Sequence, residues 1–193
     1  MPRQGLDTEI VTEAAARIVD ADGLAALTLA RLAAELGVAA PSLYKHIAGL
    51  DDLILRVTTL SIRRLTDDLT AAVLGRSGRQ ALLSVAQAYR RFAVKHASLY
   101  ALTQSGIDPK STVQKAEAAR AVEILGAAIR SYNLPDNRLI HAIRVVRAGL
   151  HGFADIEARG GFQMPLSVDE SFLVLIEALD ASLTSLGKRT KKN

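Results

Sequence analysis

The sequence predicts an all-α protein, built from a small N-terminal domain of three helices and a larger helical domain. Apolar residues recur at intervals of three and four along almost the whole chain, which is the spacing of one helix face. Glycine, proline and capping residues divide this pattern into segments of helical length. No alternating apolar pattern of strand length interrupts it. About nine helices are therefore expected.

Three of these helices fall in the first 50 residues. The first is expected over residues 7–22. The second is expected over residues 29–36, because the hydroxyl of Thr28 can cap it and Gly37 can adopt the left-handed conformation that ends a helix. The third, Pro41–Ile47, begins with a proline, which suits a first helical turn. It is too short to be stable without packing against its neighbours.

The short third helix is rich in polar side chains. Within five residues it offers a hydroxyl, a phenol, an ammonium and an imidazole, from Ser42, Tyr44, Lys45 and His46. A helix-turn-helix contacts a DNA groove with a short helix of this kind, supported by an apolar partner helix. The alternative interpretation is a plain helical corner in a bundle, because many helix pairs also have a glycine turn.

Six further helices follow. The first begins with Asp51 and Asp52, whose charges suit a helix N-terminus, and Ser77 and Ser167 open two others through capping boxes. We expect these helices over residues 51–74, 77–96, 98–105, 108 or 111 to 132, 136–159 and 167–186. The expected domains are a helix-turn-helix domain at 1–50, a regulatory and dimerisation domain at 51–187, and a disordered basic tail at 188–193.

The composition excludes several classes of protein. The 193 residues contain no cysteine, which excludes disulfides and thiolate metal sites and fits a reducing compartment. No apolar run reaches the roughly 20 residues that span a bilayer. The first ten residues lack the apolar core of a signal peptide. We therefore expect a cytoplasmic protein with no membrane partner.

The net charge of +4 is unevenly distributed. Residues 1–50 contain four basic and six acidic residues, so the N-terminal domain is slightly acidic, whereas residues 188–193 alone carry a charge of +4. The overall basicity is thus no sign that the N-terminal domain binds DNA. Contacts to phosphate would have to come from individual donors rather than from a broad basic field.

The same N-terminal stretch resembles the DNA-binding domain of the tetracycline-repressor (TetR) family. The resemblance rests on residues 36–38, Pro41–Tyr44, His46 and 51–53. It implies a homodimer that binds a palindromic double-stranded operator and responds to a small-molecule effector. Tyr44 and His46 resemble the phosphate-contacting pair of the family, Thr28 would cap its helix near the DNA backbone, and Lys45 could bond to guanine. The DNA-binding residues expected are Thr28, Ala40, Pro41, Ser42, Tyr44, Lys45 and His46.

Two positions depart from the family pattern. Ile47 stands where members often have phenylalanine, which is a tolerable exchange of one core residue for another. Leu50 stands where members often have lysine, which removes a phosphate contact. Binding would then depend more on the N–H groups at helix ends.

The C-terminal part resembles a subgroup of the same family that is named for a tryptophan-histidine-glycine motif. The motif corresponds to residues 150–152, with Leu150 in place of tryptophan, and Phe153 and Glu157 add to the likeness. The resemblance implies a ligand pocket between helices of this domain. The residues selected as candidate ligand contacts are Tyr89, Phe92, His96, Tyr100, Arg144 and Arg147.

The last two helices are apolar over a wide arc. This arc is broad enough either to be buried within one subunit or to form a four-helix bundle with the same helices of a second chain. A symmetric operator favours the second interpretation, because it needs two reading heads about 34 Å apart. The residues expected at a dimer interface are Val146, Leu150, Phe153, Phe172, Ile176, Leu179 and Leu183.

These features together predict a ligand-responsive DNA-binding transcriptional regulator and favour a repressor that a small molecule releases. A dimeric helical interaction module that has lost DNA binding is one alternative. The other is a small enzyme that uses His151 and Asp155, which lie on one helix face with Arg147 and Arg159. Such a ladder is more often an ion-pair stripe, and no nucleophile motif, phosphate loop or metal-ligand spacing accompanies it. We therefore expect no enzymatic activity, metal or cofactor.

Overall fold

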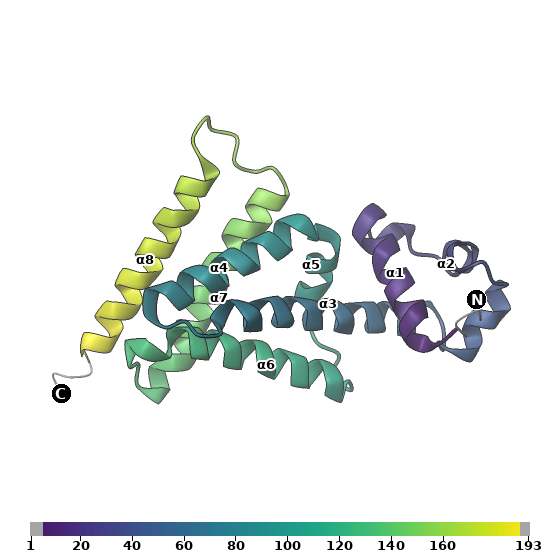
Figure 1. The fold of residues 1–193 in the computed structure, drawn as a ribbon, viewed down its shortest axis with the longest axis horizontal. Helices are drawn as coiled ribbons and strands as arrows, with labels where there is room; N and C mark the ends of the chain where they lie inside the picture. Colours follow the sequence, from purple (N-terminus) through teal and green to yellow (C-terminus); the bar gives the residue numbers. More distant parts are fainter. Residues whose placement is uncertain (1–5, 190–193) are drawn as a thin grey trace. The chain divides into compact units, whose positions relative to one another are not determined.

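The computed structural model describes residues 6–189, and within this range the chain forms helices and no strand (Figure 1). The predicted all-α class is confirmed. The nine expected helices correspond to the eight α-helices together with the 3₁₀ helix η2. The elements are α1 (Thr8–Asp22), η1 (Leu24–Ala26), α2 (Leu29–Leu36), η2 (Ala40–Lys45), α3 (Leu50–Val73), α4 (Gly78–Lys95), α5 (Ala97–Gln104), α6 (Thr112–Ile129), η3 (Arg130–Tyr132), α7 (Asp136–Ala158) and α8 (Val168–Arg189).

The chain divides into two compact units. The N-terminal unit comprises the residues up to Arg64 together with His96–Lys115. The C-terminal unit comprises Leu65–Lys95 and the chain from Ala116 onward. Each unit therefore draws on two separate stretches of sequence, whereas a single boundary after residue 50 was expected.

Helix α1 is the centre of the N-terminal unit. Its first turn is capped by Asp7, whose carboxylate accepts a hydrogen bond of 2.7 Å from the N–H of Ile10. Its inner face is fully buried and packs against α2, η1 and α5. Burial of this apolar surface is the main contribution to the stability of the unit. The core consists mainly of Val11, Ala14, Ala15, Ile18, Val19, Leu32, Leu43, Leu53, Val57, Leu99 and Leu102.

The turn between α2 and η2 agrees with the sequence prediction. The Thr28 hydroxyl accepts a hydrogen bond of 3.1 Å from the N–H of Arg31, and Gly37 ends α2 in the left-handed conformation, with φ of 65°. The helix expected over Pro41–Ile47 is instead a 3₁₀ helix over Ala40–Lys45. Bonds to the third preceding residue close a turn over fewer residues, so a short segment that starts with proline forms this tighter helix.

The N-terminal unit extends beyond the expected domain because its core is completed by later residues. Leu53 and Val57 of α3 and Leu99 and Leu102 of α5 belong to that core. The segment after α5 is also fixed, through Gln114, whose side chain is only 1% exposed. Its oxygen accepts the N–H of Asp108 at 2.8 Å, and its nitrogen donates to the carbonyl of Leu55 in α3 at 3.4 Å.

The C-terminal unit is organised around α4, which packs against α7 and α8. The six aliphatic and aromatic residues that carry most of the expected dimer interface on α7 and α8 are buried inside this single chain, and Phe153 is half-buried. They therefore form part of the interior of the unit, and their role at a dimer interface stays a prediction. The buried six are Val146, Leu150, Phe172, Ile176, Leu179 and Leu183.

Helix α8 is fixed near its C-terminal end by η3. The hydroxyl of Tyr132 donates a hydrogen bond to Asp180, and burial together with this bond raises the pKa of Tyr132. Gly187 approaches the same residue closely, since a Cβ atom there would lie 2.2 Å from the carbonyl oxygen of Tyr132. The helix continues to Arg189, two residues into the expected tail, and the rest of that tail lies outside the described residues.

Candidate nucleic-acid interface

The candidate interface is centred on residues 40–46, which we call the recognition segment. Leu43 is fully buried in the core and anchors the segment from its inner side. Its carbonyl accepts the N–H groups of both His46 and Ile47, at 2.9 and 3.1 Å. With Leu43 pointing inward, the side chain of Tyr44 points to solvent and is 60% exposed, and Lys45 is exposed beside it. The segment thus presents Tyr44 and Lys45 to solvent.

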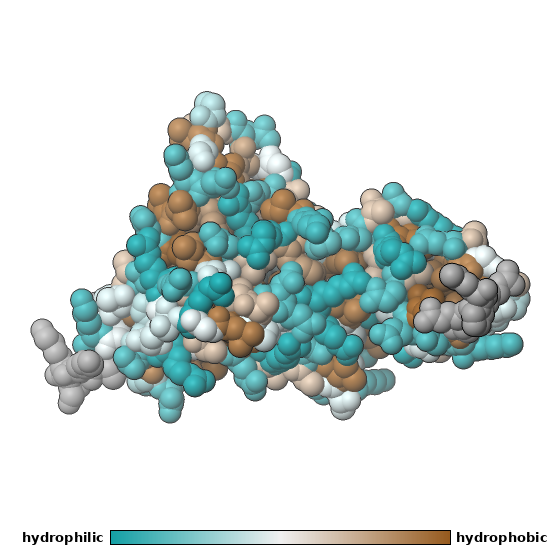
Figure 2. Space-filling view, viewed as in Figure 1, coloured by the Kyte–Doolittle hydropathy of each residue, from teal (hydrophilic) through white to brown (hydrophobic). Residues whose placement is uncertain are grey.

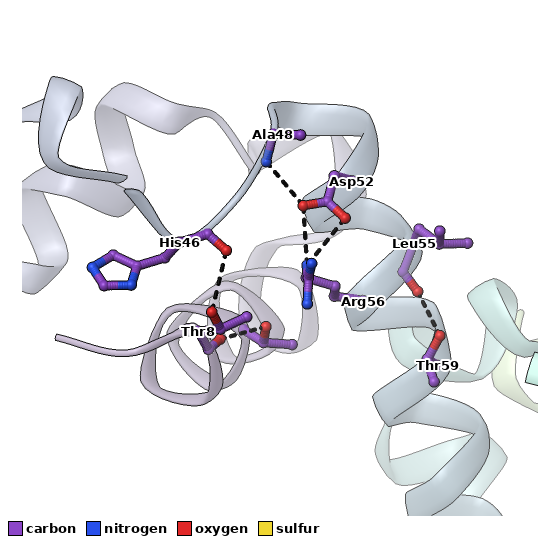
Figure 3. Close-up of polar contacts among 8 residues, drawn as sticks. Thr8, His46, Ala48, Asp52, Leu55, Arg56 and Thr59 are labelled. Atoms are coloured by element: carbon purple, nitrogen blue, oxygen red, sulfur yellow. Dashed lines mark hydrogen bonds and ion pairs between the residues drawn. The ribbon is translucent and has the colours of Figure 1, made fainter. Parts of the chain in front are cut away.

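The end of the recognition segment is held by two bonds from α1 and α3 (Figure 3). The hydroxyl of Thr8 donates to the carbonyl of His46 at 3.2 Å. The N–H of Ala48 donates to the carboxylate of Asp52 at 3.0 Å, and Arg56 donates to both oxygens of the same carboxylate, at 3.1 and 3.0 Å. We call Thr8, Asp52 and Arg56 the clamp. It fixes the backbone on either side of Ile47, while the imidazole of His46 points away from these bonds (Figure 3).

The hydrogen bonds of the clamp stabilise the ionised form of Asp52. Burial alone would raise the pKa of this carboxyl, but the hydrogen bonds from Ala48 and Arg56 outweigh burial and hold the pKa below its usual range. Asp52 therefore remains ionised at neutral pH. It also lies in the first turn of α3, where a negative charge interacts favourably with the helix dipole.

Sequence reasoning found the recognition segment but missed the clamp. Asp52 was recognised as a suitable first-turn residue and as part of the family pattern but not as a hydrogen-bond partner, and Thr8 was not singled out. Its partner is 38 residues away, which no local pattern reveals. The signal for Asp52 was present, because an acidic third residue of a helix often bonds back to an N–H before that helix.

Four arginines of the N-terminal unit are engaged in ion pairs. Arg17 lies 3.5 Å from Glu35, and Arg31, Arg56 and Arg64 pair with Asp22, Asp52 and Glu13. The ammonium of Lys45, like those of Lys110 and Lys115, forms no ion pair or hydrogen bond with any residue in the described range. It is therefore available for a phosphate or a base edge.

The other expected DNA contacts lie around the recognition segment. Pro41 is exposed, and Ala40, Ser42 and His46 are half-buried. Thr28 is exposed and uses a lone pair for the α2 cap, which leaves its hydroxyl proton able to bond to a phosphate. The structure thus gathers the expected residues of η2 on one segment and places Thr28 at the start of the preceding helix.

The unusual Leu50 has a structural role. It is half-buried and packs against the apolar core of the N-terminal unit, as Ile47 does more deeply. Leu50 is also the first residue of α3, directly after Gly49. The leucine therefore contributes apolar packing where the family often has a charged side chain.

The six candidate ligand residues are divided between the two units, and their common role in ligand binding stays a prediction. Tyr89 and Phe92 are buried in the C-terminal unit, and Arg144 and Arg147 are exposed on α7. The other two belong to the N-terminal unit. There Tyr100 is buried, and Nδ1 of His96 lies 2.7 Å from a carboxylate oxygen of Asp20 in α1.

The C-terminal unit has a surface pocket of about 600 Å³ beside α4 that sequence reasoning did not identify. One wall is Arg90, only 18% exposed, which forms two bonds of 2.6 Å with Glu157 and one of 2.7 Å with Asp169. Its guanidinium lies 4.8 Å from the ring centre of Phe172. Burial would lower the pKa of Arg90, but the Glu157 bond is the larger influence and raises it. Arg91 and Lys95 also line the pocket.

The remaining predictions concern α7 and metals. Asp155 accepts a 2.9 Å hydrogen bond from Arg159, so this part of the His151 ladder is an ion pair. The part of the chain that the structure describes contains no group of three residues able to hold a metal ion. Within residues 6–189, no helix has the length and apolar character needed to cross a membrane.

Two family profiles match the chain. The profile of bacterial regulatory proteins of the tetR family matches residues 11–57, and that of the tetracyclin repressor-like C-terminal domain matches residues 82–179. The first range contains the whole recognition segment. The tryptophan-histidine-glycine subgroup stays a prediction.

Similar proteins include uncharacterized regulators and solved structures. The HTH-type transcriptional regulator YobS of Bacillus subtilis is 31% identical over 170 residues, which is 88% of either chain. Rv0681 of Mycobacterium tuberculosis is 33% identical over 80% of this chain and 72% of its own. Two solved structures share the fold. A protein of unknown function from Rhodococcus sp. RHA1 has a TM-score of 0.81 and 23% identity, with 95% of this chain and 99% of its own covered. The TetR regulator SCO7222 of Streptomyces coelicolor has a TM-score of 0.76 and 20% identity, with 95% of this chain and 100% of its own covered. With the helix-turn-helix geometry and both profiles in agreement, the chain belongs to the TetR family of bacterial transcriptional regulators.

Proposed function

We propose that this regulator is a homodimeric repressor that binds a palindromic operator and leaves it when a small molecule binds its C-terminal unit. The observation that carries the proposal is the recognition segment, where Tyr44 and Lys45 point outward from a backbone that the clamp holds. A rigid segment loses little conformational entropy on binding, so its polar contacts contribute more fully to affinity. As a reader of bacterial DNA, the protein would act in the cytoplasm.

Relatives support the repressor and effector parts of this proposal. DrrR1 of Streptomyces coeruleorubidus, named a transcriptional repressor, is 31% identical over 79% of this chain. ActR of Streptomyces coelicolor, with TM-scores of 0.64–0.68 to this chain, has been solved without ligand and in complex with actinorhodin. The pocket beside α4 is our candidate effector site. Since Arg91 and Lys95 have no ion pair with the described residues, it suits a ligand with an anionic group.

DNA binding by the recognition segment can be tested by fluorescence anisotropy. The probe is the DNA upstream of the gene for this protein, titrated at several salt concentrations. Tyr44→Ala should abolish specific binding. Lys45→Ala should weaken binding and lower the slope of log affinity against log salt by about 1 for each chain, because one phosphate or base contact is lost.

The matched control is Lys110→Ala, which removes an exposed lysine of the same unit far from the recognition segment in sequence. It should leave both affinity and salt slope unchanged. Specific binding that survives both Tyr44→Ala and Lys45→Ala would refute the assignment of the interface. Weak binding with little salt dependence in the unmodified protein would instead favour the interaction-module alternative.

A further inference from the structure

The N-terminal unit contains a pocket that the proposed repressor mechanism does not use. It lies between α1, α3 and the start of α6 and has a volume of about 510 Å³. Small-molecule sites typically have volumes of about 300–1,000 Å³. The pocket is thus large enough for a compact organic ligand, and it is formed entirely by residues of the DNA-binding unit.

Most charged groups that line this pocket already have hydrogen-bond or ion-pair partners among the described residues, and one does not. Asp52 is bound by Ala48 and Arg56, and Glu13 pairs with Arg64. Arg63, which also lines the pocket, has an interaction of its own. Glu9 differs, because no residue in the range 6–189 forms an ion pair or hydrogen bond with its carboxylate. The available charge in the pocket is therefore negative.

Another part of the lining is apolar. Leu55 and Leu60 of α3 and Val113 of α6 all contribute to the wall. Burying a compact hydrocarbon against such side chains is favourable by about 25 cal/mol for each Å² removed from water. The lining therefore combines one unpaired carboxylate with an apolar surface.

We propose that this pocket binds a small organic amine with a compact apolar body. Its ammonium group pairs with Glu9, and its hydrocarbon body packs against Leu55, Leu60 and Val113. This site is separate from the pocket beside α4 and lies in the other unit. Binding of the amine does not depend on DNA binding, so the two proposals can fail independently.

A ligand in this pocket acts on the recognition segment, because the pocket shares residues with the clamp. Thr8 and Asp52, which line it, are the two residues that bond to the backbone at His46 and Ala48 (Figure 3). A bound ammonium group also attracts the Asp52 carboxylate and competes with Arg56 for it. A ligand in this pocket thus acts directly on the clamp, without any change in the C-terminal unit.

The test uses two probes with the same hydrocarbon cage and opposite charge, 1-aminoadamantane and 1-adamantanecarboxylate. Each is titrated into the ¹⁵N-labelled full-length protein without DNA, and amide shifts are followed by NMR. The amine should cause saturable shifts at the pocket helices, around residues 8–13 and 52–60. The carboxylate should bind about tenfold more weakly, because Glu9 repels it.

Two variants make the test specific. Glu9→Gln should weaken amine binding about fivefold, the effect of losing one partly exposed ion pair. Glu123→Gln removes an exposed carboxylate of α6 in the other unit and should leave amine binding unchanged. Equal affinities for the two probes, shifts confined to other regions, or amine binding unaffected by Glu9→Gln would each overturn the proposal.

Discussion

At the scale of single residues, the protein separates side chains that hold the recognition segment from side chains that face outward. Leu43 and the clamp residues Thr8 and Asp52 hold it, whereas Tyr44 and Lys45 project into solvent. The two groups come from different parts of the sequence. Substitutions in the first group should act through the position of the backbone, and those in the second through contacts with DNA.

Asp52→Asn is predicted to destabilise the protein at neutral pH by about 1 kcal/mol, because it removes the charge that binds both Ala48 and Arg56. Since the folded-state pKa of Asp52 lies below its unfolded value, this stabilisation is present above about pH 4 and is lost as the pH falls through the folded pKa. Urea unfolding at pH 7 and pH 3 measures it. The difference between the two proteins should shrink at pH 3.

The control is Asp51→Asn, which removes the neighbouring first-turn charge but no bond of the clamp. It should cost only the helix-dipole interaction, a few tenths of a kcal/mol. Equal losses for the two variants would contradict the clamp. Asp52→Asn should also weaken operator binding more than Asp51→Asn does.

Thr8→Val is predicted to weaken operator binding about three- to tenfold, because the carbonyl of His46 loses its hydrogen bond while the side chain keeps its shape. Anisotropy titrations measure the affinity. The salt slope should stay unchanged, since no phosphate contact is removed. A loss of affinity accompanied by a lower slope would instead indicate that Thr8 contacts DNA itself.

At the scale of the elements, the sequence predicted the features that depend on residues close together in the chain. The Thr28 cap, the left-handed Gly37, the inward Leu43 and the extent of α3 follow from residues within one or two helical turns. The 3₁₀ type of η2 was not predicted; a six-residue segment gains little from the bonds that stabilise a longer α-helix. The clamp and the packing of α5 on α1 could not be predicted, since they join distant residues.

In the C-terminal unit, Gly187 of α8 lies against the backbone of Tyr132 in η3. Gly187→Ala should destabilise the protein by about 1–3 kcal/mol, because the added methyl group overlaps the Tyr132 carbonyl. In Gly126→Ala the new methyl group would meet only the end of Ile143, at 3.5 Å. That control should be neutral or stabilising by up to about 1 kcal/mol, and thermal unfolding compares the two. Equal stabilities would mean that α8 moves away from η3 without cost.

At the scale of the whole molecule, the periodicity predicted that α7 and α8 are apolar, but it did not predict which of their apolar residues are exposed to solvent. Val146 and Leu150 are buried in the chain, whereas Val145 on the same helix is 53% exposed. Leu173 and Val174 are exposed on α8, where Figure 2 shows apolar side chains. Gly152 has open space beside it. We therefore propose that the exposed surface of α7 and α8 forms the dimer contact.

Val174→Glu is predicted to convert the proposed dimer into a monomer, because it places a charge on this exposed surface. Analytical ultracentrifugation measures the mass in solution. Val122→Glu makes the same exchange at an exposed position of α6 and should leave the dimer intact. A dimer that survives Val174→Glu, or a loss of the dimer in both variants, would locate the interface elsewhere.

The clamp has a consequence for how this regulator can change over evolutionary time. Its residues lie outside the recognition segment, so exposed positions of that segment can be exchanged without disturbing what holds it. Substitutions at exposed surface sites usually change stability by no more than about 0.5 kcal/mol. Descendants of this protein could therefore acquire new operator sequences through Lys45, which is exposed, while inheriting the same scaffold unchanged.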